Sequence, residues 1–173
     1  YSQTTFDAVA NRNVSRVQNV GRIATQGLEF SYNATDVALR GLDLLGSVTY
    51  AHSIIKENAG FVTTPGDTIG KRQPNIPRWR AAALASYRWN PQWTTSVGAR
   101  YSGQQYRTLD NADVNGFTYF GVSRFFVVDL RAQWKINKTM TASFGIDNVG
   151  NDKYWNFHPY PQRSYVAELK ADF

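Results

Sequence analysis

One segment near the C-terminal end of the chain concentrates side chains that could bind a ligand. Aromatic faces attract cations, and small-molecule sites combine apolar walls with a few well-placed polar groups. Residues 148–163 hold such a mixture of rings, hydrogen-bond donors and a cation in Tyr154, Trp155, Phe157, His158, Tyr160 and Arg163. This mixture suits an aromatic or anionic chelate. We therefore predict a ligand-binding loop that uses Tyr154, Trp155, His158, Tyr160 and Arg163, with Arg107 from an earlier loop. The alternative is that Trp155, Phe157 and two prolines only make an exposed loop rigid.

Other cations lie outside this segment and have a less specific meaning. The chain has 19 Lys and Arg against 13 Asp and Glu, a net charge of +6. Arg107, Arg124 and the pair Lys71-Arg72 could contact an anionic ligand or lipopolysaccharide phosphates. A positive charge would suit nucleic acid equally well, and solvated surface charge is the plainer interpretation. Charge alone does not choose between these partners.

Catalytic chemistry is not indicated by the residues. The sequence has two His and no Cys, which leaves no metal cluster at ligand spacing. The sequence shows no paired carboxylates, nucleophile motif or glycine-rich phosphate loop at a position where it could act. We expect no enzymatic activity and no cofactor.

The candidate loop must be held by neighbouring elements, and the last eleven residues predict one of them. Apolar and polar side chains alternate from residue 163 to the end, which is the period of a β-strand with two unlike faces. The apolar series is Tyr165, Ala167, Leu169, Ala171 and Phe173, and the other series is Ser164, Val166, Glu168, Lys170 and Asp172. Such alternation is typical of a strand that has lipid on one side and a polar interior on the other.

The same alternation occurs in six earlier segments. They are residues 16–32, 41–54, 78–89, 93–102, 126–136 and 140–147, and residues 1–8 indicate the end of an eighth strand. The predicted fold class is all-β: an antiparallel transmembrane β-barrel segment of about eight strands. We expect the lipid side to carry Ala81, Ala83, Val97, Val128, Leu130, Phe144 and Leu169. The interior is expected to carry solvated or paired charges at Glu29, Asp129, Arg131 and Lys135.

The connections between these segments alternate in length. Tight turns are expected at Asn90-Pro91 and Asn137-Lys138, and a moderately short one at residues 33–40. Long loops are expected at residues 56–75, 107–121 and 148–162. Outer-membrane barrels have short periplasmic turns and long extracellular loops. If the C-terminus is periplasmic, every long loop lies outside the cell.

Tryptophan positions provide a second check on this orientation. Trp79 and Trp89 lie ten residues apart on one face, which corresponds to about 23 Å along the normal of a tilted strand. Aromatic girdles flank an apolar band of about 25 Å in such barrels. Trp89, Trp93 and Trp134 would form the inner girdle, and Trp79, Tyr101 and Phe126 the outer one. The alternative, a soluble sandwich with core aromatics, conflicts with the many Arg and Asp on the opposite face.

Four short motifs occur in order along the chain. They are Asn19-Val20-Gly21 followed by Gly27-Leu28-Glu29, Asn75-Ile76-Pro77, the segment 148–154 that ends at Tyr154, and Pro161-Gln162-Arg163. Each is weak by itself, but together and in this order they resemble the C-terminal third of the barrel of TonB-dependent outer-membrane receptors. Val149, Gly150, Asn151, Asp152 and Gln162 depart from the family pattern, which weakens any choice of subfamily. From the residues themselves we expect structural roles: strand bending or close strand approach at Gly21 and Gly27, a strand start at Pro77 and a capped turn at Asn148.

The resemblance implies the following function and partners. The family has a barrel of about 22 strands around a plug, so residues 1–173 are expected to be the C-terminal portion of the barrel, with the plug and earlier strands absent. The chain begins at Tyr1 without a secretory leader, and we expect truncation. The implied function is energy-dependent import of a scarce nutrient, most often a ferric siderophore, in the bacterial outer membrane. Expected partners are membrane lipid, lipopolysaccharide, the ferric ligand and the TonB complex through the missing N-terminal part, with no nucleic acid. The resemblance also implies that Phe173 helps the insertion machinery recognise the chain.

Two alternatives stay open at this point. Eight strands can close by themselves, so the chain could be a complete small outer-membrane barrel with a structural or adhesin role. A soluble ligand-binding barrel is the third possibility. Pairing between the first and last strands would indicate a closed small barrel, whereas an open curved sheet would support a fragment.

Overall fold

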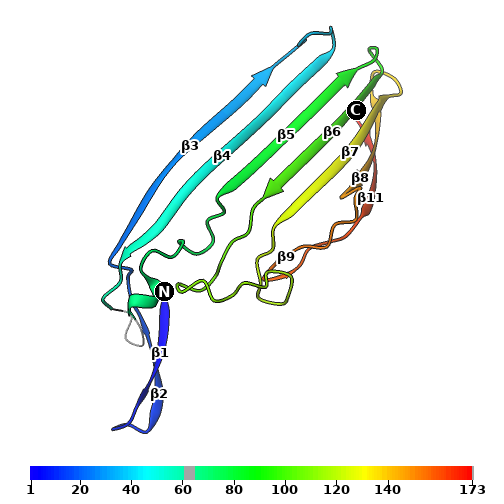
Figure 1. The fold of residues 1–173 in the computed structure, drawn as a ribbon. Coiled ribbons are helices and arrows are strands. Elements are labelled where there is room, and N and C mark those ends of the chain that lie inside the picture. Colours follow the sequence, from blue (N-terminus) through cyan, green and yellow to red (C-terminus); the bar gives the residue numbers. More distant parts are fainter. Residues whose placement is uncertain (61–64, 173) are drawn as a thin grey trace.

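The computed structural model describes residues 1–60 and 65–172, and it is an open antiparallel β-sheet with long loops at one end (Figure 1). Seven strands form the main sheet in the order β11–β8–β7–β6–β5–β4–β3. Two short hairpins, β1–β2 and β9–β10, lie outside it. The bounds are β1 Ser2–Asp7, β2 Arg12–Val17, β3 Arg22–Ala34, β4 Leu42–Glu57, a 3-10 turn η1 Pro65–Thr68, β5 Trp79–Arg88, β6 Trp93–Ser102, β7 Phe125–Lys135, β8 Met140–Asp147, β9 Trp155–Asn156, β10 His158–Pro159 and β11 Ser164–Ala171.

The two faces of the sheet differ as the alternation predicts. Residues directly opposite one another in an antiparallel ladder share a face. The ladders pair Val48 with Ala81, Ala83 with Ala99, and Val97 with Leu130, so the apolar set is continuous from strand to strand. Many of its large side chains are exposed, with Leu28 80%, Phe126 59% and Leu169 63% accessible. An apolar face of this extent suits contact with lipid. In residues 1–60 and 65–172 no second sheet packs on it as a soluble sandwich would require.

The expected strand over residues 16–32 is wrong at its start. Residues 12–17 form β2, which pairs with β1 in a separate hairpin that projects beyond the long loops (Figure 1). The segment predicted as an eighth strand is therefore one arm of this hairpin, and the main sheet has seven strands. The break falls at residues 18–21, where Gln18 and Tyr1 exchange backbone hydrogen bonds of 2.9 Å. Alternation continues through the break, so the sequence pattern could not separate the hairpin from β3.

The two tight turns use the same device. The side-chain Oδ1 of Asn90 accepts hydrogen bonds from the backbone N–H groups of Gln92 and Trp93, at 2.9 and 2.8 Å. Asn137 Oδ1 accepts from Thr139 and Met140 at 2.9 and 2.8 Å. An Asn side chain that accepts hydrogen bonds from the backbone N–H groups two and three residues later closes a short loop between antiparallel strands. Both predicted turns are confirmed.

Short and long connections lie at opposite ends of the sheet, as the sequence predicts. The turns after β3, β5 and β7 lie at the upper end in Figure 1, and the connections at residues 58–60 with 65–78, 103–124 and 148–163 lie at the lower end. The backbone N–H of Asp172 donates to Thr139 O at 2.8 Å, which places the C-terminal end beside a short turn. Phe173 lies outside the described residues.

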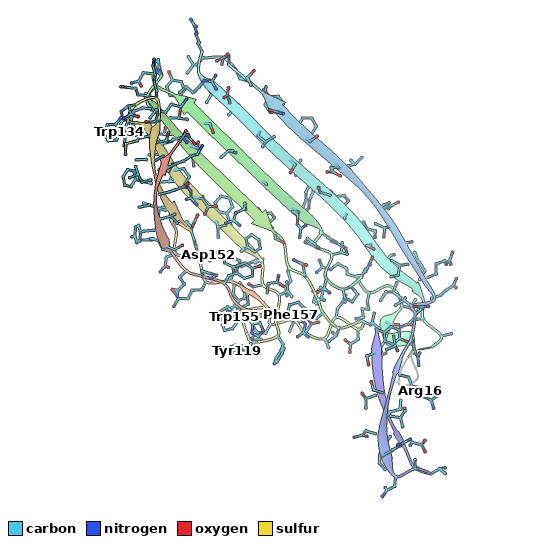
Figure 2. The ribbon with its side chains drawn as sticks, turned by 180° about the vertical axis from the view of Figure 1, so that it is seen from behind. Arg16, Tyr119, Trp134, Asp152, Trp155 and Phe157 are labelled. Carbon is cyan, nitrogen blue, oxygen red and sulfur yellow. The ribbon has the colours of Figure 1, made fainter. Side chains whose placement is uncertain are left out.

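Aromatic side chains of the apolar face gather at both of these ends. Near the turns the rings of Trp93 and Trp134 stack with centroids 5.5 Å apart, and Trp89 Nε1–H donates to Thr95 Oγ1 at 2.8 Å. At the loop end Trp79 packs on Tyr50 with centroids 4.8 Å apart. Figure 2 shows Trp134 far from the labelled aromatic side chains of the loops. This arrangement agrees with two aromatic girdles around an apolar band.

The polar face carries cross-strand ion pairs. Arg100 Nη2 lies 3.0 Å from Asp129 Oδ2, and Arg131 Nη2 lies 2.5 Å from Asp147 Oδ1. Arg88, at the turn end, pairs with Asp43 and Asp36. The expected paired charges at Asp129 and Arg131 are thus confirmed. No helix among the described residues has the length and apolarity needed to cross a membrane.

Gly27 allows β3 and β4 to approach, and its replacement provides the first testable prediction. A Cβ atom at Gly27 would lie 2.2 Å from the carbonyl oxygen of Tyr50, so the backbone must move to admit it. Overpacking of this kind costs about 1–3 kcal/mol. We expect Gly27→Ala in the complete protein to reduce the folded, membrane-inserted fraction, measured by heat-modifiable mobility in detergent gels.

Gly98→Ala is the matched control for this prediction. Gly98 also lies within a strand of the main sheet, β6, but its nearest neighbour for an added Cβ is Leu84 Cδ1 at 3.8 Å, an ordinary contact. We expect this variant to insert normally. Equal loss in both variants would show that any side chain at a strand glycine is harmful, and equal insertion would contradict the close approach.

Candidate functional site

The two longest loops at the C-terminal side of the sheet are joined by backbone hydrogen bonds. Phe120 N–H donates to Phe157 O at 2.8 Å, and Phe157 N–H donates to Gly121 O at 2.9 Å. One step along, Ser123 N–H donates to Trp155 O at 3.0 Å, and Ser123 Oγ accepts from Trp155 N–H at 2.7 Å. Residues 120–123 thus act as a short extra strand beside the β9–β10 hairpin. This ladder fixes the positions of the aromatic side chains.

Tyr154 is the buried anchor of the loop at residues 148–163. Its ring is 6% exposed and lies between Phe125, at a centroid distance of 4.5 Å, and Tyr160, at 4.8 Å. Tyr160 N–H also donates to Tyr154 O at 2.9 Å. Burial raises the pKa of the Tyr154 phenol, so this group stays neutral throughout the physiological range. Of these two predicted ligand residues, Tyr160 is exposed, and Tyr154 is placed to support it.

The half-buried Trp155 and the exposed His158 belong to a second ring cluster. Tyr119, from the other loop, packs edge-on against Trp155 with centroids 4.9 Å apart, and its centroid lies 6.3 Å from that of His158. Figure 2 shows Tyr119, Trp155 and Phe157 together at the loop end of the molecule. We call Tyr119, Trp155 and His158 the outer aromatic cluster. Its exposed ring faces and the imidazole could stack on and hydrogen-bond to a flat ligand.

Arg107 lies against aromatic side chains of both loops. Its guanidinium carbon lies 4.5 Å from the ring centroid of Phe157 and 5.6 Å from that of Phe120, and Nη1–H donates to Phe120 O. The backbone N–H of Arg107 donates to Asp113 Oδ2 at 2.6 Å. The cation therefore clamps the two loops together, and this engagement reduces its availability to an anion.

The remaining predicted contacts are separate from the outer aromatic cluster. Arg163 follows the β9–β10 hairpin, and its backbone N–H donates to Asn151 Oδ1 at 3.1 Å. Arg72 lies over the ring of Tyr106 at 4.5 Å, and Arg124 is exposed. The structure thus brings Trp155 and His158 into one cluster and Tyr154 and Tyr160 into another, while Arg107 joins the loops.

Apart from Arg107 and Arg124, the contribution of the loop at residues 103–124 was not predicted from the sequence. Tyr119 and Ser123 form direct contacts with Trp155, and Phe120 contacts Arg107. A signal was present, because Phe117, Tyr119 and Phe120 form an aromatic group between Gly116 and Gly121. Its pairing with a segment some 35 residues later could not be read from periodicity.

The turn at Asn148 connects this site to the sheet. Asn148 Nδ2–H donates to Asp152 O, and its Oδ1 accepts from Asp152 N–H, both at 2.8 Å. The backbone of Asn148 has a φ of 52°, a left-handed conformation that Asn tolerates. The prediction that Asn148 caps a turn with its side chain is confirmed.

Comparison with known proteins gives a consistent family assignment. A family model described as TonB dependent receptor-like, beta-barrel matches residues 1–149. The probable TonB-dependent siderophore receptor PiuA of Acinetobacter baumannii is 26% identical over 144 residues, 79% of this chain and 18% of that protein. The ferripyoverdine receptor of Pseudomonas aeruginosa is 24% identical over 120 residues, 67% of this chain and 14% of that protein. The chain thus spans less than a fifth of the length of these relatives.

Solved structures agree with the fold. The unliganded ferric citrate transporter FecA superposes with a TM-score of 0.71 at 18% identity, over 87% of this chain and 24% of its own. The copper transporter OprC has a TM-score of 0.66 at 15% identity, over 99% of this chain and 26% of its own. At such identities the likeness establishes the fold alone.

The clamp by Arg107 provides the second prediction. Two cation–π contacts are worth about 1–2 kcal/mol together, so we expect Arg107→Ala to raise hydrogen exchange at residues 117–123 and 155–160 about tenfold. Mass spectrometry of the complete protein in detergent measures this exchange. Arg124→Ala removes an exposed arginine next to the same loop and should leave exchange unchanged. Unaltered exchange in Arg107→Ala would show that the backbone ladder holds the loops without the clamp.

Proposed function

The chain belongs to the TonB-dependent receptor β-barrel family, and we propose that it forms barrel wall and outer loops of a receptor that imports a ferric siderophore. In this proposal residues 1–173 are the C-terminal portion of the barrel, and the plug and earlier strands belong to the rest of the protein. The small share of the relatives that the chain covers supports this, 18% for PiuA. Energy would reach the receptor from the TonB complex through the N-terminal part.

The two-faced sheet is the observation that carries the proposal. One continuous apolar face, ring clusters at both ends and loops of unequal length fit a wall that crosses an outer membrane. The short turns then lie in the periplasm and the long loops outside the cell. Lipid covers the apolar face, and lipopolysaccharide phosphates are the proposed partners of exposed cations such as Lys71 and Arg124.

The proposed ligand follows from the outer aromatic cluster and from the relatives. PiuA is named as a siderophore receptor and FecA as a ferric citrate transporter. The rings of Tyr119 and Trp155 and the imidazole of His158 provide stacking faces and a hydrogen-bonding group for a chelate, and Tyr160 and Arg163 follow on the same loop. OprC, a copper transporter, has the same fold. The fold therefore does not determine the transported ligand, and we expect the loops to select it.

The alternative of a complete eight-stranded barrel with a structural or adhesin role has no support in the sheet. Among the described residues, β3 and β11 are the two edges of the sheet, and they do not pair with each other.

We also propose that Phe173 helps the insertion machinery recognise the chain.

Ferric chelate binding to cells that carry the intact receptor tests the ligand assignment. We expect the combined change of Tyr119, Trp155 and His158 to Ala to weaken binding by about 100-fold, because each lost stacking contact costs about 1 kcal/mol or more. The control is Phe6→Ala, which removes an exposed ring from the β1–β2 hairpin and should leave affinity unchanged.

Two results would contradict different parts of the proposal. Normal affinity of the triple variant at normal surface expression would remove the role of the outer aromatic cluster. Absence of iron-regulated uptake in cells with the unmodified receptor would remove the siderophore assignment and leave the barrel intact.

A further inference from the structure

The ladder between β7 and β8 ends where two aspartates would face each other. Its last pair is Leu130 with Ile146, and the next pair in the same register would be Asp129 with Asp147. Like charges directly opposite one another destabilise an antiparallel pair. Beyond this point the register slips by one residue, because Val149 N–H donates to Val128 O at 2.8 Å.

Each aspartate is neutralised by an arginine on the polar face. Asp129 pairs with Arg100 of β6 at 3.0 Å, and Asp147 pairs with Arg131 of β7 at 2.5 Å. Gly145 makes room for the second pair, since a Cβ atom there would lie 2.6 Å from Arg131 Nη1. The four charges form two similar pairs at the loop end of the strands.

The two aspartates differ in one respect. Asp129 uses its second oxygen, Oδ1, to accept the backbone N–H of Asn148 at 2.9 Å. Asn148 is 4% exposed and closes the turn to Asp152, whose Oδ2 accepts Phe126 N–H at 3.3 Å. The turn then leads directly to Tyr154 and the β9–β10 hairpin. Asp129 is therefore a bridge between the wall, through Arg100, and the start of the loop, through Asn148.

We propose that Asp129 is a positioning residue that sets the place of residues 148–163, and that its ion pair with Arg100 orients its carboxylate for this bond. A hydrogen bond to an ionised acceptor is stronger than one between neutral groups. The inference concerns how the proposed ligand-binding loop is held, and in that sense it rests on the proposed function. The position of the loop can nevertheless be measured without any ligand.

The test is a spin-label distance in the complete receptor. This chain contributes no native cysteine, so nitroxides at Asn156→Cys in the hairpin and Lys138→Cys in a short turn report the loop against the wall. Both positions are exposed. We expect one narrow distance distribution for the parent and a displaced population that rises about tenfold in Asp129→Ala.

Asp147→Asn is the matched control, because it removes the charge that pairs with an arginine of the neighbouring strand and keeps the acceptor of the Asn148 N–H in place. It should keep the narrow distribution. Asp129→Asn keeps an oxygen that can accept the Asn148 N–H and loses the charge, so it should lie between the parent and Asp129→Ala. A parent-like distribution in Asp129→Ala, or equal broadening in Asp147→Asn, would overturn the proposal.

A second pair of variants decides the question if Asp129→Ala fails to insert. Arg100→Gln frees the Asp129 carboxylate and should broaden the distribution. Arg131→Gln removes the partner of Asp147 and a bond to Leu130 O, leaves the Asp129 carboxylate paired, and should not broaden it. Equal distributions in these two variants would contradict the role of the Arg100 pair. Because all samples lack ligand, failure here leaves the siderophore assignment untouched, and weak chelate binding leaves this inference untouched.

Discussion

The structure depends on keeping one apolar face continuous across six strand pairings. Side chains alternate sides along a strand, so a slip of one residue in any ladder would move a whole strand's apolar set to the polar face. The observed ladders avoid this: Leu28 lies opposite Tyr50, Ala85 opposite Val97, and Ala132 opposite Phe144. Among the described residues no second sheet packs on the apolar face, so the register depends on the contrast between the apolar and the polar face.

Close packing is found at the loop end of this sheet. The most buried side chains include Ile55, Val122, Val127 and Tyr154, together with polar residues such as Asn148. Loops joined to one another in this way have fewer conformations than independent loops. They therefore lose less conformational entropy when a ligand binds to them. The sheet thus provides a rigid base for the joined loops. In the proposed receptor these loops select the ligand.

Most of the fold could be predicted from the sequence because period-two alternation is a local property. It located the seven strands of the sheet, their faces, and the order of short and long connections. It failed at residues 12–21, since a hairpin arm and a sheet strand alternate alike. The site was predicted less well. Trp155 and His158 were proposed from residue type, but their contacts with Tyr119 and the clamp by Arg107 join distant loops, which leave no periodic signal.

In the proposed receptor, one face of this sheet contacts lipid and the other faces a polar interior. Nitroxide accessibility along β7 of the complete receptor in lipid bilayers tests it most directly, with single cysteines at each position from Phe126 to Gln133. Oxygen, which concentrates in the bilayer, should collide most with labels at Phe126, Val128, Leu130 and Ala132, and a polar nickel chelate least with the same positions. Accessibility without a period of two residues, or with the opposite phase, would show that these side chains do not face lipid.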